Sequence, residues 1–422
     1  MKGEWKTMPL ADCMAAIIDY RGKTPNKTTY GVPLVTAKVI KSGRIEQPDE
    51  FIAEADFVEW MRRGMPMPGD IVMTTEAPLG EIAQLDGKKV ALAQRVITLR
   101  GKSDLLDNTF LKFLMQSRAV QDELESRATG TTVLGIRQSE LRKVNLTLPP
   151  LPTQRAIAHV LGTLDDLIEL NRETNAILEE MARALFKSWF VDFDPVRAKL
   201  EGRPPAGMDA ETAKLFPDHF QDSELGEIPR GWESASLGDV VEVFDSKRVP
   251  LSGMQREQRQ GPYPYHGAAS VMDYIDDYLF DGIYMLMGED GSVTKENGTP
   301  VVQYVWGKFW VNNHAHVLRG KNGICTEHLL LYLKETNIEA FVTGAVQAKL
   351  NQGNMNRIPF LLPPIEIGEA FASEIEPLFA TIRANADESR DLATLRDTLL
   401  PKLLSGELSV AEVEGRIAER MP

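Results

Sequence analysis

The chain has 422 residues, of which 43% are hydrophobic and 26% charged, so it is long enough for two or three globular domains. Its two cysteines, Cys13 and Cys325, are too few and too distant for a disulfide framework or a cysteine-rich zinc site. No run of about 18 apolar residues and no signal-peptide core is present, which indicates a cytoplasmic protein that does not cross a membrane.

The charge distribution argues against a protein that binds nucleic acid alone, because such proteins are usually basic. The formal net charge is −14. Residues 1–150 are nearly neutral, with 21 basic and 19 acidic side chains, and the acidic excess lies in the rest of the chain. A binder that works within a larger complex, whose other subunits supply positive charge, remains open.

One segment of the chain occurs twice. Residues 129–150 run in step with residues 343–364, at a constant shift of 214 and without a gap. Gly130 matches Gly344, and both segments end in Leu-Pro-Pro before a long stretch with helical character. The two glycines are expected to serve a backbone turn. The repeat predicts two related domains, each followed by a related helix.

Short strands and one helix are predicted in each copy of the body that precedes this repeat. Apolar runs bounded by Gly, Pro or Asp predict strands, at 31–35, 70–74, 90–92, 283–287 and 301–306. One helix is expected in each body, over 108–127 in the first and from Thr326, its N-cap, to Phe341 in the second. Each body, 1–150 and 225–362, is therefore expected to be a mixed α/β globule.

The two stretches after Leu-Pro-Pro, 151–193 and 363–408, carry a sevenfold apolar repeat. Its first seam is Ile157, Leu164, Asn171, Leu178 and Leu185, its second is Val160, Leu167, Thr174 and Met181, and the later copy has Phe371, Leu378, Asn385, Leu392 and Leu399. Such spacing predicts two antiparallel coiled-coil-like helices, each about 50–60 Å long at 1.5 Å per residue.

The first seam of each of the two stretches contains an asparagine at the same step, Asn171 and Asn385. A polar residue in a helical seam costs stability but fixes register. If the helices pair about a pseudo-twofold axis, the two amides are expected to bond to each other. The alternative is that each points to solvent.

Two further segments complete the chain. Residues 194–224 are rich in proline and lack periodicity, which predicts a linker. Residues 409–422 are expected to form a C-terminal tail.

Several phrases resemble one family. The phrase LPPLPTQRAIA at 148–158 resembles the start of a conserved helix, and LDDLI with ALFKSWFVDF resembles its body and exit. GEIPRGW at 226–232 resembles the beginning of a second recognition domain, and LLPKLLSGEL at 399–408 resembles a C-terminal signature. Together they resemble the specificity subunit of a type I restriction–modification enzyme, over nearly the whole chain. The second copy departs from the pattern at 365–368, where the LPxQ part is lost.

The resemblance implies an α+β protein with a pseudo-twofold internal repeat. Two target-recognition domains, 1–150 and 225–362, would each read one half of a split DNA sequence, and the helices would measure the unread spacer. It also implies that double-stranded DNA, two methyltransferase subunits and, where cleavage occurs, two motor-nuclease subunits are the partners. S-adenosylmethionine would then belong to the methyltransferase and no cofactor to this chain.

No motif for catalysis was found, which favours a non-catalytic subunit. His314 and His316 would share one face of a strand, but no acidic or cysteine partner lies close in sequence, so no metal site is predicted. Two rival functions remain: a repeat scaffold that binds only protein, which the acidic balance favours, and a self-sufficient methyltransferase or nuclease.

Candidate DNA contacts are polar residues on loops near corresponding landmarks, since Arg and Lys suit guanine and Asn and Gln suit adenine. In the first body they are Arg21, Lys23, Thr24, Lys38, Lys41, Arg44, Gln94, Arg95, Arg137 and Gln138. In the second they are Lys247, Arg248, Asn313, His314, Lys349, Asn351 and Gln352. The alternative for each is a solvated surface side chain.

Three aromatic residues at the end of the first long helix, Trp189, Phe190 and Phe193, have two interpretations. They belong either to a core or to a surface that docks a methyltransferase helix, because aromatic residues often anchor interfaces.

Overall fold

The computed structural model describes residues 5–22, 24–344 and 347–418. The chain divides into two compact units. The first unit comprises Met1–Leu170 and Glu388–Pro422, and the second comprises Asn171–Asp387. Within the described ranges, no helix combines the length and the apolar character that a membrane crossing requires.

The first unit is built around two four-stranded sheets. Its strands are β1 (Lys6–Pro9), β2 (Met14–Asp19), β3 (Lys27–Thr28), β4 (Val32–Val35), β5 (Ile40–Lys41), β6 (Arg44–Ile45), β7 (Phe51–Ile52), β8 (Ile71–Thr75), β9 (Leu79–Gln84), β10 (Ala91–Leu92), β11 (Val96–Gly101) and β12 (Asn145–Leu148). Its helices are α1 (Leu10–Cys13), α2 (Phe57–Trp60), α3 (Asn108–Gln116), α4 (Arg118–Ser126), α5 (Gln138–Leu141), α14 (Val410–Ala418) and parts of α6 and α13.

The second unit has the same kind of construction. Its strands are β13 (Phe220–Ser223), β14 (Gly226–Pro229), β15 (Glu233–Ser236), β16 (Val241–Val243), β17 (Gln260–His266), β18 (Val271–Ile275), β19 (Phe280–Asp281), β20 (Tyr284–Gly288), β21 (Val302–Val305), β22 (Lys308–Val311), β23 (Ala315–Gly320) and β24 (Pro359–Leu362). Its helices are α7 (Asp194–Leu200), α8 (Ala210–Leu215), α9 (Leu237–Val240), α10 (Gly253–Glu257), α11 (Thr326–Glu335), α12 (Gln352–Asn356) and the remaining parts of α6 and α13.

The sheet topology is duplicated as the sequence repeat predicts. The main sheet has the order β2-β11-β8-β9 in the first unit and β16-β23-β20-β21 in the second. The register is also shared, because Leu99 pairs with Ile71 in one sheet and Leu318 pairs with Met285 in the other. In each unit a two-stranded ladder, β1-β12 or β15-β24, closes the body just before the long helix.

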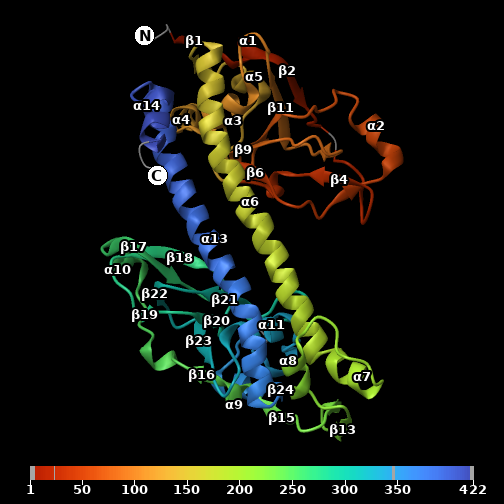
Figure 1. Ribbon diagram of the computed structural model, residues 1–422. Helices are drawn as coiled ribbons and strands as arrows, with labels where there is room; N and C mark the ends of the chain where they lie inside the picture. Colours follow the sequence, from red (N-terminus) through yellow and green to blue (C-terminus); the bar gives the residue numbers. More distant parts are fainter. Residues whose placement is uncertain (1–4, 23, 345–346, 419–422) are drawn as a thin grey trace. The chain divides into compact units, whose positions relative to one another are not determined.

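The two long helices are α6, Leu151–Phe190 with 40 residues, and α13, Ile365–Ser405 with 41 residues. They run antiparallel and pack together within each unit. In the first unit the carboxylate of Asp165 accepts from the guanidinium of Arg396 at 2.7 Å. In the second, the rings of Phe186 and Phe371 lie 6.3 Å apart. Figure 1 shows the main sheet of the first unit beside α6. Ile157 of α6 belongs to the buried core of this unit, together with residues of the main sheet.

The predicted pairing of Asn171 with Asn385 is wrong by one helical turn. The amide of Asn385 donates to the side-chain oxygen of Asn175 at 2.9 Å, and Asn175 donates in turn to the carbonyl of Ile382 at 3.1 Å. A polar pair does lie in the seam, as expected from the cost of leaving an amide there without a partner. Its first member is the asparagine four residues further along α6.

The two long helices begin at equivalent residues but are attached to their units differently. Leu151 and Ile365 are related by the same shift of 214 as the repeat. Gln154, which is 1% exposed, accepts from the amide of Asp107 and donates to the carbonyls of Leu105 and Pro149. The equivalent position in α13 is Gly368, where a Cβ would stand 2.4 Å from the carbonyl oxygen of Gly323. The lost glutamine is therefore replaced by direct backbone contact.

Other sequence predictions need correction. The helix expected over 108–127 is two helices, because Ser117 is extended (φ −66°, ψ 146°) and separates α3 from α4. The N-cap of α11 is Cys325, whose sulfur accepts from the amide of His328, instead of Thr326. The expected tail contains α14. The expected linker, 194–224, contains α7, α8 and β13 and buries Phe216 in the core of the second unit.

Candidate nucleic-acid interface

The repeated segment forms the same closed turn in both units. We call residues 129–138 the first repeat turn and 343–352 the second repeat turn, of which 345–346 lie outside the described residues. Thr129 and Gly135 exchange two backbone hydrogen bonds of 2.9 and 3.0 Å, and the equivalent Thr343 and Lys349 exchange two of 2.8 and 2.7 Å. The next residue in each turn, Ile136 or Leu350, donates its amide to the carbonyl of Thr75 or Glu289. Each turn is thereby fixed to the end of β8 or β20.

The two glycines act as the sequence predicted. Gly130 has φ +122° and Gly344 has φ +93°, in the region that residues with a Cβ rarely adopt. A Cβ on Gly130 would stand 2.1 Å from the carbonyl oxygen of Val133, and one on Gly344 would stand 2.1 Å from that of Gln347. The turn therefore requires glycine at both equivalent positions.

A hydrogen-bonded or ion-paired couple of side chains flanks each repeat turn at equivalent places. In the first unit Glu76 follows β8 and forms an ion pair with Arg95, which precedes β11, at 2.8 Å. In the second unit Asp290 follows β20 and bonds to His314, which precedes β23. The landmarks chosen from the sequence, 94–95 and 313–314, are thus brought beside the repeat turn, although about 30 residues or more separate them from it.

Some predicted DNA contacts have side chains that remain available. They lie on the repeat turns or beside them, and their side chains have no hydrogen-bond or ion-pair partner among the described residues. These are Arg137, Gln138, Asn313, Lys349 and Gln352, and all except the half-buried Gln138 are exposed. The two units hence offer the same frame. Gln138 and Gln352 are equivalent, whereas Arg137 in the first unit and Asn313 and Lys349 in the second differ from their counterparts.

The predicted basic cluster in the first unit is largely neutralised. Lys38 contacts the carboxylates of Asp49 and Glu50 at 3.1 and 3.0 Å, and Lys41 contacts Glu46 at 3.0 Å. Arg44 lies within 4.0 Å of two carboxylates, those of Glu46 and Glu169. These exposed pairs are weak and can be exchanged for phosphate, but they give no strong positive patch.

The remaining polar candidates have local partners. The amide of Gln94 donates to the hydroxyl of Thr24 at 3.3 Å. The ammonium of Lys247 lies over the ring of Phe244, 5.1 Å from its centroid. Asn351 accepts from the amide of Asn354 and caps α12. The candidate Lys23 lies outside the described residues.

Two arginines predicted to contact DNA make internal contacts within their own units. Arg21 donates to the carbonyl of Ile136 at 2.5 Å. Arg248, with 13% of its side chain exposed, donates to the carbonyl of Ala315 at 2.7 Å and contacts Glu289 at 2.7 Å and Asp245 at 3.3 Å. Sequence reasoning missed these roles because the partners are distant in sequence.

His316 belongs to the same internal network as Arg248. Its Nδ1 lies 2.6 Å from the carboxylate of Asp245 and its Nε2 lies 2.8 Å from the carbonyl oxygen of Leu350. Burial opposes a charge on this imidazole, but the bond to Asp245, its negative charge, the Leu350 carbonyl and Glu289 together raise the pKa of His316. Asp245, Glu289 and His316 have ligand types that suit a metal. The guanidinium of Arg248 already contacts both carboxylates, so we assign no metal to them.

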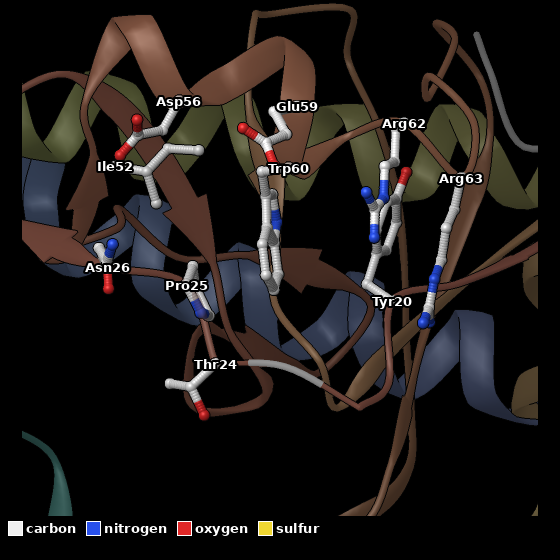
Figure 2. A pocket seen from close by; sticks show the side chains of 10 residues that line it. All are labelled: Tyr20, Thr24, Pro25, Asn26, Ile52, Asp56, Glu59, Trp60, Arg62 and Arg63. Carbon is white, nitrogen blue, oxygen red and sulfur yellow. The ribbon is translucent and has the colours of Figure 1, made fainter.

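A hollow of about 230 Å³ in the first unit was not predicted from the sequence. Figure 2 shows the ring of Trp60 in the middle of the group, with Pro25 and Thr24 on one side of it and Tyr20, Arg62 and Arg63 on the other. The Tyr20 and Trp60 rings are stacked with centroids 6.4 Å apart. Arg62 is exposed, and an exposed cation beside aromatic rings suits a phosphate backbone with unpaired bases.

The aromatic residues proposed for partner docking belong to the core. Trp189 is 2% exposed and Phe190 8%, and both pack on Phe371 of α13. Phe193 is half-buried, adopts φ +55° and lies 5.8 Å from the ring of Trp232. The core interpretation therefore holds for Trp189 and Phe190, because α7, α8 and their connections fold over the end of α6.

Exposed apolar side chains occur elsewhere on α6. In the first unit Leu167 is 41% exposed and Leu170 57%. In the second, Ile177 is 63% exposed and Met181 52%. Leu167 and Met181 belong to the second seam predicted from the heptads, so that seam is exposed at these two residues. Apolar residues at this spacing on an exposed helix face favour contact with another protein.

Comparisons with known proteins agree with this arrangement. A family model described as the type I restriction modification DNA specificity domain matches residues 2–180 and 229–392. The type I restriction enzyme MjaIX specificity subunit of Methanocaldococcus jannaschii is 28% identical over 421 residues, covering 93% of this chain and 91% of the relative. The HindI specificity subunit of Haemophilus influenzae is 26% identical over 377 residues, covering 77% and 82%. The crystal structure of a type I restriction–modification S subunit from M. genitalium has a similar fold, with a TM-score of 0.54, 16% identity and coverage of 95% and 96%.

Proposed function

This chain belongs to the type I restriction–modification DNA specificity family, and we propose that it recognises a bipartite DNA sequence to which it directs partner subunits. Each unit would read one half of the sequence. The chain itself would be non-catalytic, and the methyltransferase subunit would bring S-adenosylmethionine and the chemistry.

The observation that carries the proposal is the repeat turn. Both units hold it with equivalent backbone bonds, at the end of the same sheet, while some of the side chains that it presents differ, such as Lys349 in place of Gly135. A constant frame with variable polar side chains suits two readers that recognise different bases. The preferred candidates for contact with DNA are Arg137 and Gln138 in the first unit and Asn313, Lys349 and Gln352 in the second.

Contacts to phosphates would supply affinity, and contacts to base edges would supply specificity. Arg137 suits guanine and the carboxamides of Asn313, Gln138 and Gln352 suit adenine. Arg62 and the Trp60 hollow would contact the backbone or a splayed base beside the first repeat turn. The acidic balance of the whole chain, −14, makes tight binding by the isolated chain unfavourable and assigns much of the affinity to the assembled complex.

We further propose that two methyltransferase subunits dock on the chain, and that two motor-nuclease subunits join them where cleavage occurs. The exposed apolar side chains of α6 are the proposed contacts, with Leu167 and Leu170 in one unit and Ile177 and Met181 in the other. One such set in each unit fits two copies of one partner. The long helices would set the length of the unread spacer, because the rise per residue of a helix is fixed.

A protein-binding scaffold without DNA specificity is the rival function. It is favoured by the acidic charge and by the exposed apolar side chains of α6. The two functions are separated by measuring how the methyltransferase complex containing this chain shifts the mobility of DNA. Binding that depends on salt and on sequence in two separate half-sites supports the proposal, and binding that is equally strong to all sequences contradicts it.

A further inference from the structure

Two different side chains contact equivalent backbone carbonyls in the two units. In the first unit Arg21 donates from Nη2 to the carbonyl of Ile136 at 2.5 Å. In the second unit His316 Nε2 lies 2.8 Å from the carbonyl oxygen of Leu350. Ile136 and Leu350 are equivalent residues, since they are related by the shift of 214 and lie in the two repeat turns.

The two side chains come from positions that are not equivalent. His316 pairs with Met287 in the sheet, and the residue at the same register in the first unit is Ile97, which pairs with Met73. Arg21 instead follows β2 at the edge of the sheet. The bodies have thus diverged while the contact to the carbonyl has been kept, which indicates that the turn needs it.

Each of the two side chains, Arg21 and His316, contacts an aspartate that lies at the end of the first strand of its sheet or just after it. Asp19 lies 3.5 Å from Nε of Arg21 and accepts from its backbone amide at 3.0 Å. Asp245 lies 2.6 Å from Nδ1 of His316 and also accepts from the amide of Val317 at 2.9 Å. In both units, therefore, a nitrogen-bearing side chain links an aspartate carboxylate to the turn carbonyl.

We propose that Arg21 and His316 are equivalent positioning residues, each holding the repeat turn of its own unit in the geometry that reads DNA. This inference rests on the proposed function and deepens it. A hydrogen bond from a charged donor is among the stronger contacts that a backbone carbonyl can receive. Without this contact the carbonyl would lose its side-chain donor, the turn would move relative to the sheet, and its backbone bonds would open more often.

The two holding contacts differ in their response to pH. Arginine stays charged throughout the accessible range. His316 faces two oxygen acceptors, and an imidazole can donate to both only when it is protonated. It also faces Glu289 at 3.8 Å and the Arg248 guanidinium, which bonds to both carboxylates. With His316 charged, two carboxylates balance two cations, and deprotonation would leave one negative charge uncompensated in a buried site.

The direction of the pH effect follows from these contacts. The pKa of His316 is raised above its ordinary value of 6.5, so the contact is complete below pH 6.5 and is lost as the pH rises through the higher value in the folded protein. We therefore expect recognition of the second half-site to weaken with rising pH, while recognition of the first does not.

The test compares variants in the assembled methyltransferase complex. Discrimination at each half-site is measured as the ratio of Kd values for duplexes with a scrambled and an intact half-site, from below pH 6.5 upward. His316→Ile, which copies the residue at that register in the first unit, should lower second-half discrimination about tenfold near neutral pH. His316→Gln, which can still donate to the carbonyl, should retain most of the second-half discrimination and remove the pH dependence of that discrimination. His219→Gln, at an exposed histidine, should leave both unchanged.

Arg21 variants test recognition of the first half-site. Arg21→Leu should lower only first-half discrimination, and Arg21→Lys should restore part of it, without a new dependence on pH. The inference is overturned if the Arg21 and His316 variants affect both halves alike. It is also overturned if wild-type second-half discrimination does not change with pH, an outcome that stands even if His316→Ile does not fold.

A measurement without DNA separates this inference from the proposed function. Amide hydrogen exchange of the free chain should be faster at Thr343 and Lys349 in His316→Ile than in the wild type, and unchanged at Thr129 and Gly135. If the wild-type complex proves unselective but exchange responds in this way, the proposed function fails and the positioning role stands. Unchanged exchange at Thr343 and Lys349 contradicts the positioning role itself.

Discussion

Alanine at either glycine of the repeat turns should disable one half of the recognition and spare the other. Gly344 has φ +93°, and a Cβ there would stand 2.1 Å from the carbonyl oxygen of Gln347. Gly130 has the same contact with Val133 in the first unit. Because the blocking atom is backbone, the turn cannot accept the methyl group by rotating a side chain.

The cost can be estimated from two separate effects. A residue with a Cβ in the left-handed region loses about 1–2 kcal/mol. Relief of the clash in Gly344→Ala requires the turn to open, which endangers the two bonds between Thr343 and Lys349, each worth about 1 kcal/mol net. Together these effects place Gly344→Ala at about 3–4 kcal/mol of local destabilisation.

A matched control isolates the clash from the backbone strain. Gly231, also in the second unit, has φ +84° with nothing within 4 Å of the position that a Cβ would take, so Gly231→Ala should cost only about 1–2 kcal/mol. Hydrogen exchange at Thr343 and Lys349 gives the local free energy, and half-site Kd ratios give the effect on DNA. Equal costs for Gly344→Ala and Gly231→Ala, or intact second-half discrimination in Gly344→Ala, would refute the reasoning.

Three further predictions concern the helices and the core. Asn385→Leu should lower the free energy of unfolding by about 1–3 kcal/mol in urea titrations, because Asn175 loses its partner. The double variant Asn385→Leu with Asn175→Leu should lower it less, since no amide is left without a partner. An equal or larger loss for the double variant contradicts this reasoning. Burial lowers the pKa of His328 to about 3, below the 6.5 of the unfolded chain, so stability present above pH 6.5 is lost as the pH falls. His328→Leu should therefore make the Tm depend less on pH over this range, and a pH dependence of the Tm equal to that of the wild type argues against this reasoning. Ile177→Ser, at a side chain 63% exposed, should weaken methyltransferase assembly about tenfold without lowering the Tm, and its neighbour control Ala176→Ser should not; equal binding of both variants counts against docking on α6.

Much of the framework could be predicted because it depends on local patterns. The repeat, the strand runs and the apolar periodicity predicted two related bodies and two antiparallel helices, and α6 and α13 begin at residues related by the repeat. The glycines of the repeat turns were also identified, since their need for positive φ is a property of the turn itself.

What failed depends on contacts between residues that are far apart in sequence. Asn175 replaces Asn171 in the polar pair because the way the helices meet decides which turn faces Asn385. Trp189 is buried because Phe216 of the supposed linker packs against its ring at 5.0 Å. Arg248 points inward because the carboxylate of Glu289 and the carbonyl of Ala315 accept hydrogen bonds from its guanidinium.

Sequencing of the methylated bases in the host genome tests the central claim most directly. It compares cells with the intact gene, cells without it, and cells in which residues 1–150 are exchanged for those of a related subunit. The account predicts that one bipartite methylated motif is lost on deletion and that the exchange changes only one half of it. Unaltered methylation after deletion, or a change in both halves after the exchange, would contradict the account.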